Sequence, residues 1–74
     1  MKINVQRTKE SYRPGTRIEL IYMDGETRYS EGDTGTVTDV DDMGTIHMRW
    51  DKGGSLGLIP GQDIFRVITD DTAV

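Results

Sequence analysis

The 74-residue sequence has no cysteine, two prolines, and a single tryptophan, phenylalanine and histidine. Without cysteine it can form no disulfide framework, and zinc sites built from thiolates are excluded. It also has no apolar run long enough to span a membrane, and its first ten residues lack the apolar core of a secretion signal. These absences predict a single small cytoplasmic domain that does not enter a membrane and that relies on a modest hydrophobic core.

The charged residues are unevenly distributed along the chain, whose net charge is −4. Residues 1–17 carry five basic side chains and one acidic side chain, a balance of +4, whereas residues 18–74 carry four basic and twelve acidic ones, a balance of −8. A mainly acidic body disfavours general binding to a phosphate backbone, although a short basic segment can still contact a duplex. We therefore expect a basic, flexible N-terminal arm at residues 1–13, followed by an acidic domain.

The sequence does contain short β-prone runs separated by glycine-rich turns. Hydrophobic residues make up 34% and charged residues 30%, with nine glycines, which suits a turn-rich β-domain better than a helical bundle. The expected strands lie at residues 16–23, 34–40, 45–50, 56–59 and 64–69. No segment shows the 3.6-residue apolar stripe of an amphipathic helix. We therefore expect an all-β domain of five short strands over residues 14–69, with a loose C-terminal tail at residues 70–74.

The stretch VDDMGTIHMRWDKG raises a choice between a metal or catalytic site and a β-hairpin. Side chains alternate along a strand, so Ile46, Met48 and Trp50 are expected to share one apolar face. Gly44 follows the aspartates at a place where a tight turn needs a positive φ angle. This pattern favours a hairpin whose apolar face, Trp50 included, packs in the core.

The aspartates before this strand do not make a calcium-binding loop. Aligned from Asp39, an EF-hand loop needs an oxygen ligand at its fifth position and a glutamate at its twelfth, but the chain has Met43 and Trp50 there. Asp41 and Asp42 are instead typical of a turn, in which aspartate side chains accept backbone hydrogen bonds. No metal ion is expected here.

The remaining polar residues offer little for catalysis. His47 is the only histidine, whereas zinc needs about four ligands. Ser11, Ser30 and Ser55 lie in no nucleophile motif, and a domain of this size has little room for a water-excluding cleft between paired carboxylates. We expect no enzyme activity and no cofactor.

The predicted strand order resembles that of Src-homology-3-like (SH3-like) barrels. EGDTGTVTDV lies where such domains place a glycine-aspartate before the second strand, and GLIPGQDIFRVI resembles their turn before the last strand. PGTRIELIYM, GDTGTVTDVDDMGTIHMRWDKGGSLGLIPGQD and the Phe65 that follows are similar to an uncharacterised family of small domains from Firmicutes, their plasmids and integrative elements, and their phages. This similarity covers residues 12–65, and its most specific part is the tryptophan-aspartate-x-glycine stretch. It implies a small five-stranded SH3-like barrel and a biological setting, but no activity.

Aromatic recognition of the kind used by peptide-binding SH3 domains is not expected. Those domains carry a tryptophan at the start of the third strand and a tyrosine after the proline turn, whereas this chain has residues near Thr45 and Ile64 at those places. An aromatic cage or stacking platform needs several aromatic residues together. Trp50 and Phe65 are expected in the core, so the sequence predicts neither a polyproline groove nor such a platform.

We expect a non-enzymatic interaction module from a mobile element or phage, which docks on a host or element-encoded protein through its loops and acidic surface. Such a domain could modulate or inhibit a nucleic-acid enzyme, with carboxylates standing in for phosphates. The residues expected to contact the protein partner are Glu26, Arg28, Tyr29, Glu31, Asp41 and Asp42.

The alternative is a nucleic-acid-binding small barrel that uses its basic N-terminal arm to contact the phosphate backbone. The basic residues expected to make these contacts are Lys2, Arg7, Lys9, Arg13 and Arg17. The two hypotheses place the binding site at opposite ends of the charge distribution. The positions of these side chains therefore bear directly on the choice between a protein partner and a nucleic acid.

Overall fold

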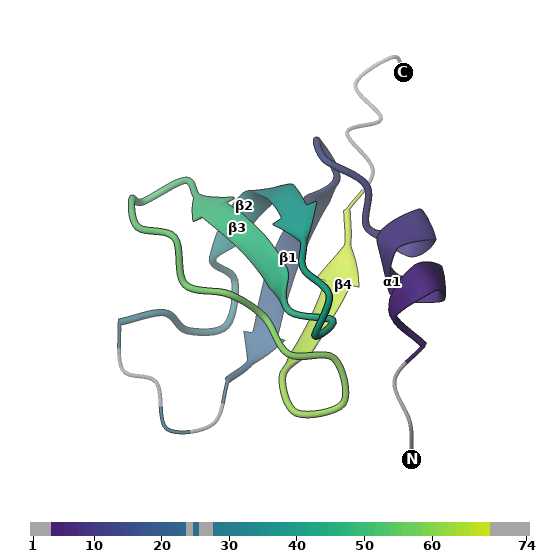
Figure 1. Ribbon diagram of the computed structural model, residues 1–74. Coiled ribbons are helices and arrows are strands. Elements are labelled where there is room, and N and C mark those ends of the chain that lie inside the picture. Colours follow the sequence, from purple (N-terminus) through teal and green to yellow (C-terminus); the bar gives the residue numbers. More distant parts are fainter. Residues whose placement is uncertain (1–3, 24, 26–27, 69–74) are drawn as a thin grey trace.

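The computed structural model describes residues 4–23, 25 and 28–68, which form a mostly β domain with one short helix (Figure 1). The elements in chain order are α1 (Val5–Ser11), β1 (Arg17–Tyr22), β2 (Thr34–Val40), β3 (Ile46–Trp50) and β4 (Ile64–Val67). The four strands of this part of the chain pair antiparallel in the order β3-β2-β1-β4, so the sheet is open and does not close into a barrel. Within the described ranges, no helix is long and apolar enough to cross a membrane.

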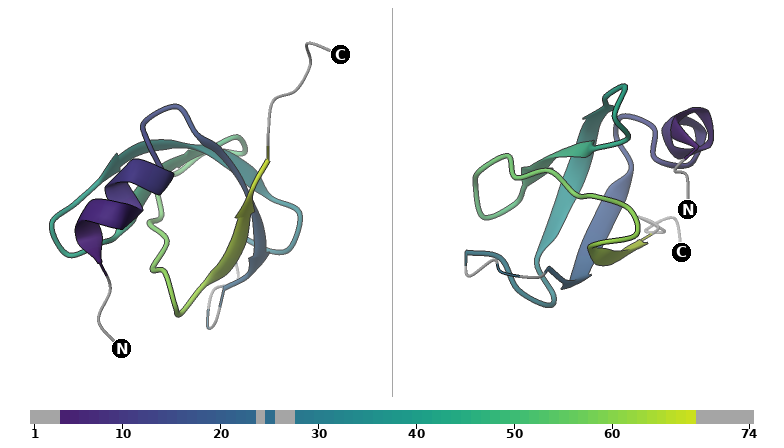
Figure 2. Two further views of the ribbon diagram at one scale, coloured as in Figure 1. Left: turned by 90° about the vertical axis from the view of Figure 1, so that its right-hand side faces the viewer. Right: turned by 60° about the horizontal axis from the view of Figure 1, so that its bottom comes forward.

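The core lies between the curved sheet and the segment that leads from β3 to β4, which crosses the concave face of the sheet (Figure 2). Trp50 is only 2% exposed. Its ring centroid lies 5.0 Å from that of Tyr29, and its Nε1 donates a hydrogen bond to the carbonyl of Leu56 at 2.8 Å. The buried apolar residues are Ile18, Leu20, Tyr29, Val37, Val40, Ile46, Met48, Trp50 and Leu58.

Strands β2 and β3 approach each other so closely that one position of β2 has no room for a side chain. A Cβ atom on Gly35 would lie 2.9 Å from the carbonyl oxygen of Arg49 and 3.1 Å from the Cα of Trp50. Real Cβ atoms rarely come this close to backbone, so glycine is required here. Gly35 pairs with Trp50 in the β2–β3 register, so glycine allows the two backbones to approach at the position that carries the largest buried ring.

Strand β3 and the turn before it match the sequence prediction. Burial alternates along β3, with Ile46, Met48 and Trp50 buried and the two residues between them exposed. Gly44 has a φ angle of 89°, and its N–H donates to the carbonyl of Asp41 at 3.0 Å, which closes the turn. This polar stretch is therefore a hairpin, as its alternation indicated.

The fourth expected strand, at residues 56–59, is not a strand. Leu58 pairs with the sheet only through an isolated antiparallel bridge to Ile46, with both hydrogen bonds at 2.8 Å. In an antiparallel ladder the next position that bonds to the same neighbour lies two residues on, at Pro60, which has no N–H to donate, so the pairing ends at Leu58. The described chain thus has four strands in an open sheet, where the sequence predicted a closed five-stranded barrel.

The N-terminal segment contains helix α1 where the sequence predicted a flexible arm and no helix. Asn4 caps the helix, because its side chain accepts a hydrogen bond from the Arg7 N–H at 3.0 Å. Thr8 is buried, and the ring of Tyr12 packs edge-on against that of Phe65 with the centroids 5.5 Å apart. These contacts make α1 part of the folded domain.

A bidentate ion pair joins β1 to the residue that follows β3. The guanidinium of Arg17 donates to both carboxylate oxygens of Asp51, at 2.8 and 2.6 Å, and the hydroxyl of Thr34 donates to the same carboxylate at 2.6 Å. These bonds, that of Arg17 above all, hold the pKa of Asp51 well below its usual range. Side chains from three neighbouring strands or their ends are thereby linked on the face of the sheet opposite the core.

Replacing Trp50 with alanine should lower the free energy of unfolding by about 3 to 5 kcal/mol, because it removes a large buried ring and leaves a cavity. Trp50→Phe should cost less, since an aromatic ring remains and the main loss is the hydrogen bond to Leu56. Urea unfolding followed by circular dichroism measures both changes. A Trp50→Ala protein with an unchanged melting temperature would contradict the buried position.

The Asp51 pair predicts a stability that falls in acid. A carboxylate with a lowered folded-state pKa contributes stability above its unfolded pKa of about 3.9, and this contribution is lost as the pH falls below that value. Asp51→Asn should therefore be less stable than the unmodified chain at neutral pH, but should lose less stability between about pH 5 and pH 2. Urea midpoints across this range test the expectation, and identical pH dependence of the two proteins would refute it.

Removing residues 1–12 should destabilise the domain, since it deletes α1 and uncovers Phe65. Tyr12→Ala alone should lose the ring contact, about 0.5 to 1.5 kcal/mol beyond the lost buried area. Gln6→Ala serves as the control, because Gln6 is exposed on the same helix and bonds only to Glu10, a pair of the kind worth about 0.2 to 0.5 kcal/mol. Equal melting temperatures for the two variants would mean that Tyr12 does not anchor the segment.

Candidate functional site

Asp41, one of the carboxylates expected to contact a partner, is used to build the β2–β3 turn. Its Oδ1 accepts hydrogen bonds from the N–H groups of Met43 and Thr45, at 2.9 and 3.0 Å, and its Oδ2 lies 2.9 Å from Nε2 of His47. The contact with His47, followed by the bond from Thr45, lowers the pKa of Asp41. In the described part of the chain, no three histidine or acidic residues are grouped so that they could hold a metal ion.

Asp42 and Lys9, which the two sequence hypotheses assigned to opposite binding sites, lie next to each other. The Nζ of Lys9 on α1 is 3.1 Å from a carboxylate oxygen of Asp42 in the turn. Both side chains are exposed, so the pair adds little stability. It does mean that helix α1 and the acidic turn form one surface of mixed charge, and Arg17 is likewise engaged with Asp51.

The loop between β1 and β2 is held to the turn after β3. Tyr29 is 6% exposed, and its hydroxyl donates to the carbonyl of Gly53 at 2.8 Å. Lys52 donates to the carbonyl of Arg28 at 2.8 Å and to Asp33 at 3.2 Å. Tyr29 was expected to contact a partner, but the structure places it in the core, because its ring completes the packing on Trp50.

The other residues of the two expected sets divide into three groups. Arg28 and Glu31 are exposed in the loop before β2, and the guanidinium of Arg28 lies 5.9 Å from the ring centroid of Tyr29. Arg7 and Arg13 are exposed at α1 and just after it. The remaining two expected residues lie outside the described residues: Glu26 and Lys2. Of the expected acidic contacts that the structure describes, Glu31 lies in the loop before β2 and Asp41 and Asp42 lie in the β2–β3 turn.

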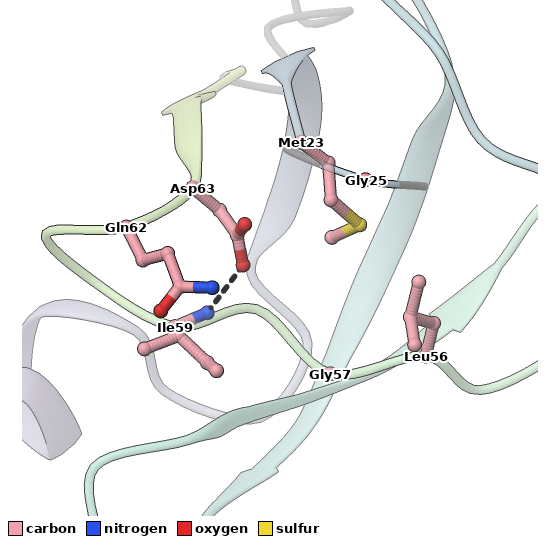
Figure 3. Close-up of a pocket in the computed structure, with 7 residues that line it drawn as sticks. All are labelled: Met23, Gly25, Leu56, Gly57, Ile59, Gln62 and Asp63. Atoms are coloured by element: carbon pink, nitrogen blue, oxygen red, sulfur yellow. Dashed lines mark hydrogen bonds between the residues drawn. The ribbon is translucent and has the colours of Figure 1, made fainter. Parts of the chain in front are cut away.

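A groove of about 170 Å³ lies between the end of β1 and the segment that leads into β4 (Figure 3). The residues that line it are Met23, Gly25, Leu56, Gly57, Ile59, Gln62 and Asp63. Three of these side chains are apolar and form its walls, and one is a carboxylate. Most ligand pockets enclose about 300 to 1,000 Å³, whereas an engineered apolar cavity of about 150 Å³ holds one benzene molecule. The groove thus has the size of a single side chain.

The groove owes its shape to a turn closed by Asp63. The N–H groups of Gln62 and Asp63 both donate to the carbonyl of Ile59, at 3.0 and 2.9 Å. In addition, the Asp63 carboxylate accepts a hydrogen bond from the Ile59 N–H at 2.8 Å. This turn leaves Ile59 with 41% of its surface exposed at the edge of the groove. On the opposite wall, Leu56 is positioned through its carbonyl, which accepts from the Trp50 indole.

The chemistry of the groove suits binding better than catalysis. In the part of its lining that the structure describes, Asp63 is the only titratable side chain, so these residues do not supply an acid and base pair. Its three apolar walls and single carboxylate are the elements of a small recognition site, in which apolar contact supplies affinity and one polar group supplies orientation.

Sequence reasoning did not identify this groove. Its walls come from Met23 and from residues more than 30 positions later, and nothing in the local pattern shows that these segments meet. The one local signal is Ile59, an apolar residue placed directly before the Pro60-Gly61 turn. Connecting segments run over the protein surface, so an apolar residue beside this turn is a candidate for an exposed side chain.

Comparison with known proteins supplies a family but no activity. No curated protein and no solved structure shows a significant match to the chain. The family model described as "Domain of unknown function (DUF4314)" matches residues 1–68. The match includes α1 and all four strands, so the helix that replaces the expected arm lies inside the family domain. The chain therefore belongs to the DUF4314 family of domains of unknown function.

Proposed function

We propose that this domain is a non-enzymatic protein-interaction module that binds a short segment of a partner protein in the groove between Met23 and Ile59. The observation that carries the proposal is the exposed side chain of Ile59 beside the apolar walls formed by Met23 and Leu56. Full burial of a side chain such as isoleucine is worth about 1.5 to 3 kcal/mol. A partner side chain that enters the groove would gain part of this free energy and cover Ile59.

Charge favours a protein over a nucleic acid at this groove. The described residues that line it include no lysine or arginine to neutralise a phosphate, and they include the carboxylate of Asp63. Lys9 and Arg17, two of the residues expected to contact nucleic acid, are engaged with Asp42 and Asp51. Phosphate contacts in the described part of the chain would thus rest on fewer basic groups than the sequence indicated.

Nucleic-acid binding is the second candidate, and the exposed positions of Arg7 and Arg13 at and just after α1 support it. Two such contacts would give weak binding with a shallow dependence on salt, because each phosphate contact contributes about 0.9 to the slope of log affinity against log salt on duplex DNA. This candidate would use α1 and not the groove.

The proposal also includes the SH3-like relationship, the biological setting and the action on a nucleic-acid enzyme that the sequence predicted. The order of long loop, hairpin and proline turn supports an SH3-like relationship, although the described sheet is open. The setting in Firmicutes and their mobile elements or phages stays a prediction from the resemblance. Action on a nucleic-acid enzyme through an acidic surface also stays a prediction, with less support, because Asp41, Asp42 and Asp51 are engaged within the domain.

Selection of a displayed random-peptide library against the domain tests the proposal. Ile59→Ser should weaken binding of the selected peptides at least tenfold, because it removes most of one apolar wall of the groove without adding a charge. Met43→Ser is the matched control: Met43 is 84% exposed in the β2–β3 turn, outside the groove, and undergoes a similar loss of apolar surface. Affinities measured by fluorescence polarisation should fall for the first variant only.

Equal affinities for Ile59→Ser and the unmodified domain would place peptide binding outside the groove and reject the proposal. The nucleic-acid candidate is tested with labelled duplex DNA and single-stranded RNA at several salt concentrations. Binding of either, with a salt slope reduced by Arg7→Ala and Arg13→Ala and unchanged by Ile59→Ser, would favour the second candidate instead.

A further inference from the structure

We infer that the groove takes a lysine side chain of the partner, whose methylene stem lies against Met23, Leu56 and Ile59 and whose ammonium group pairs with the free carboxylate oxygen of Asp63. This inference rests on the proposed function and names the chemical group that the groove recognises. Among the described residues that line the groove, Asp63 is the only one with a charged side chain.

Asp63 is a nearly buried carboxylate with one oxygen unused. The residue is 8% exposed, and its Oδ2 accepts from the Ile59 N–H at 2.8 Å. Among the described residues, no fully buried side-chain nitrogen or oxygen lacks a hydrogen-bond partner, so the second oxygen, Oδ1, must keep contact with solvent. Figure 3 shows the carboxylate pointing from the start of β4 into the space between Met23 and Ile59.

Among the described residues Asp63 is the only buried carboxylate, and it has no basic partner. Within the described part of the chain, a lysine, arginine or histidine side chain pairs with each of Glu19, Asp33, Asp41, Asp42 and Asp51. Asp63 is more buried than these, yet its one hydrogen bond there comes from a neutral backbone N–H. A carboxylate withdrawn from water is costly unless it is paired. A cation from another molecule would supply the missing partner.

The walls and the geometry of the carboxylate favour lysine. A lysine side chain buries its four methylene groups along apolar surface while its ammonium group remains at a polar site, and the groove offers apolar walls of this kind next to Asp63. Arginine gains most when its planar fork binds both oxygens of a carboxylate. Because Oδ2 is already held by Ile59, one oxygen remains free, and a point charge such as ammonium needs only one.

Methionine-methyl NMR can test the inference with small probes. Met23 lines the groove, Met48 is buried in β3 and Met43 is exposed in the β2–β3 turn, so the three methyl signals report on the groove, on folding and on nonspecific binding. Nα-acetyl-lysine amide should shift the Met23 signal with saturation in about the millimolar range, as expected for a ligand of this size. Nα-acetyl-norleucine amide, which has the same four-carbon stem without the ammonium group, should bind at least tenfold more weakly.

Two variants connect this response to Asp63. Asp63→Asn keeps an oxygen that can accept from the Ile59 N–H and removes the charge, so the lysine probe should lose at least tenfold in affinity while the Met48 signal stays in place. Asp39→Asn removes the same charge at an exposed position of β2 and should leave the response unchanged. Gln62→Lys, which supplies a cation within the chain at the edge of the groove, should also block the lysine probe.

The remaining outcomes overturn the inference in distinguishable ways. Equal binding of the lysine and norleucine probes would mean that apolar contact alone accounts for the affinity and that Asp63 does not recognise an ammonium group. Tighter binding of Nα-acetyl-arginine amide would reject lysine as the preferred group. A Met23 signal that no probe shifts would also reject it. If library peptides still bind and Ile59→Ser weakens that binding, the proposed function survives that failure. If those peptides bind without regard to Ile59, both proposals fall together.

Discussion

The rest of the domain depends on the burial of one indole ring. Trp50 ends β3, and its ring and Nε1 contact the two long segments that are not part of the sheet: the loop before β2 through Tyr29, and the segment before β4 through the carbonyl of Leu56. A chain of this length buries only about 60% of its unfolded surface, so few residues can share this role. The loss of close contact at Trp50 would release both walls of the groove at once.

The elements that could be predicted from the sequence are those whose burial is decided by near neighbours. The alternation of Ile46, Met48 and Trp50 shows which face of β3 is buried, and Gly44 indicates the turn before it. Helix α1 could not be predicted with the same ease, because it is too short to show a repeated stripe and is held by a contact between Tyr12 and Phe65, which lie far apart in the sequence. The missing strand follows from Pro60, which has no N–H to continue the pairing that Leu58 begins with Ile46.

The candidate site was less predictable than the fold, and for an electrostatic reason. A sequence gives the number of charges but not which charged side chains lie next to each other. Asp41 and Asp42 were expected to contact a partner, but Asp41 contacts His47 and Asp42 pairs with Lys9. The sequence does not indicate that the carboxylate of Asp63 lines the groove, because Asp63 belongs to no acidic cluster or motif. Its significance comes from burial next to apolar side chains contributed by a distant loop.

The open sheet has a consequence for how copies of this chain meet one another. A sheet that does not close has two edge strands whose backbone groups can pair with another molecule. At one edge, Leu58 occupies part of β3 through its bridge to Ile46. At the other, β4 spans only Ile64–Val67 and carries Arg66, whose Nε donates to Glu19 at 2.6 Å. Ile64 and Val67 are exposed on this strand, so it is the shortness of β4, and not a polar surface, that limits strand addition between crowded copies of the domain.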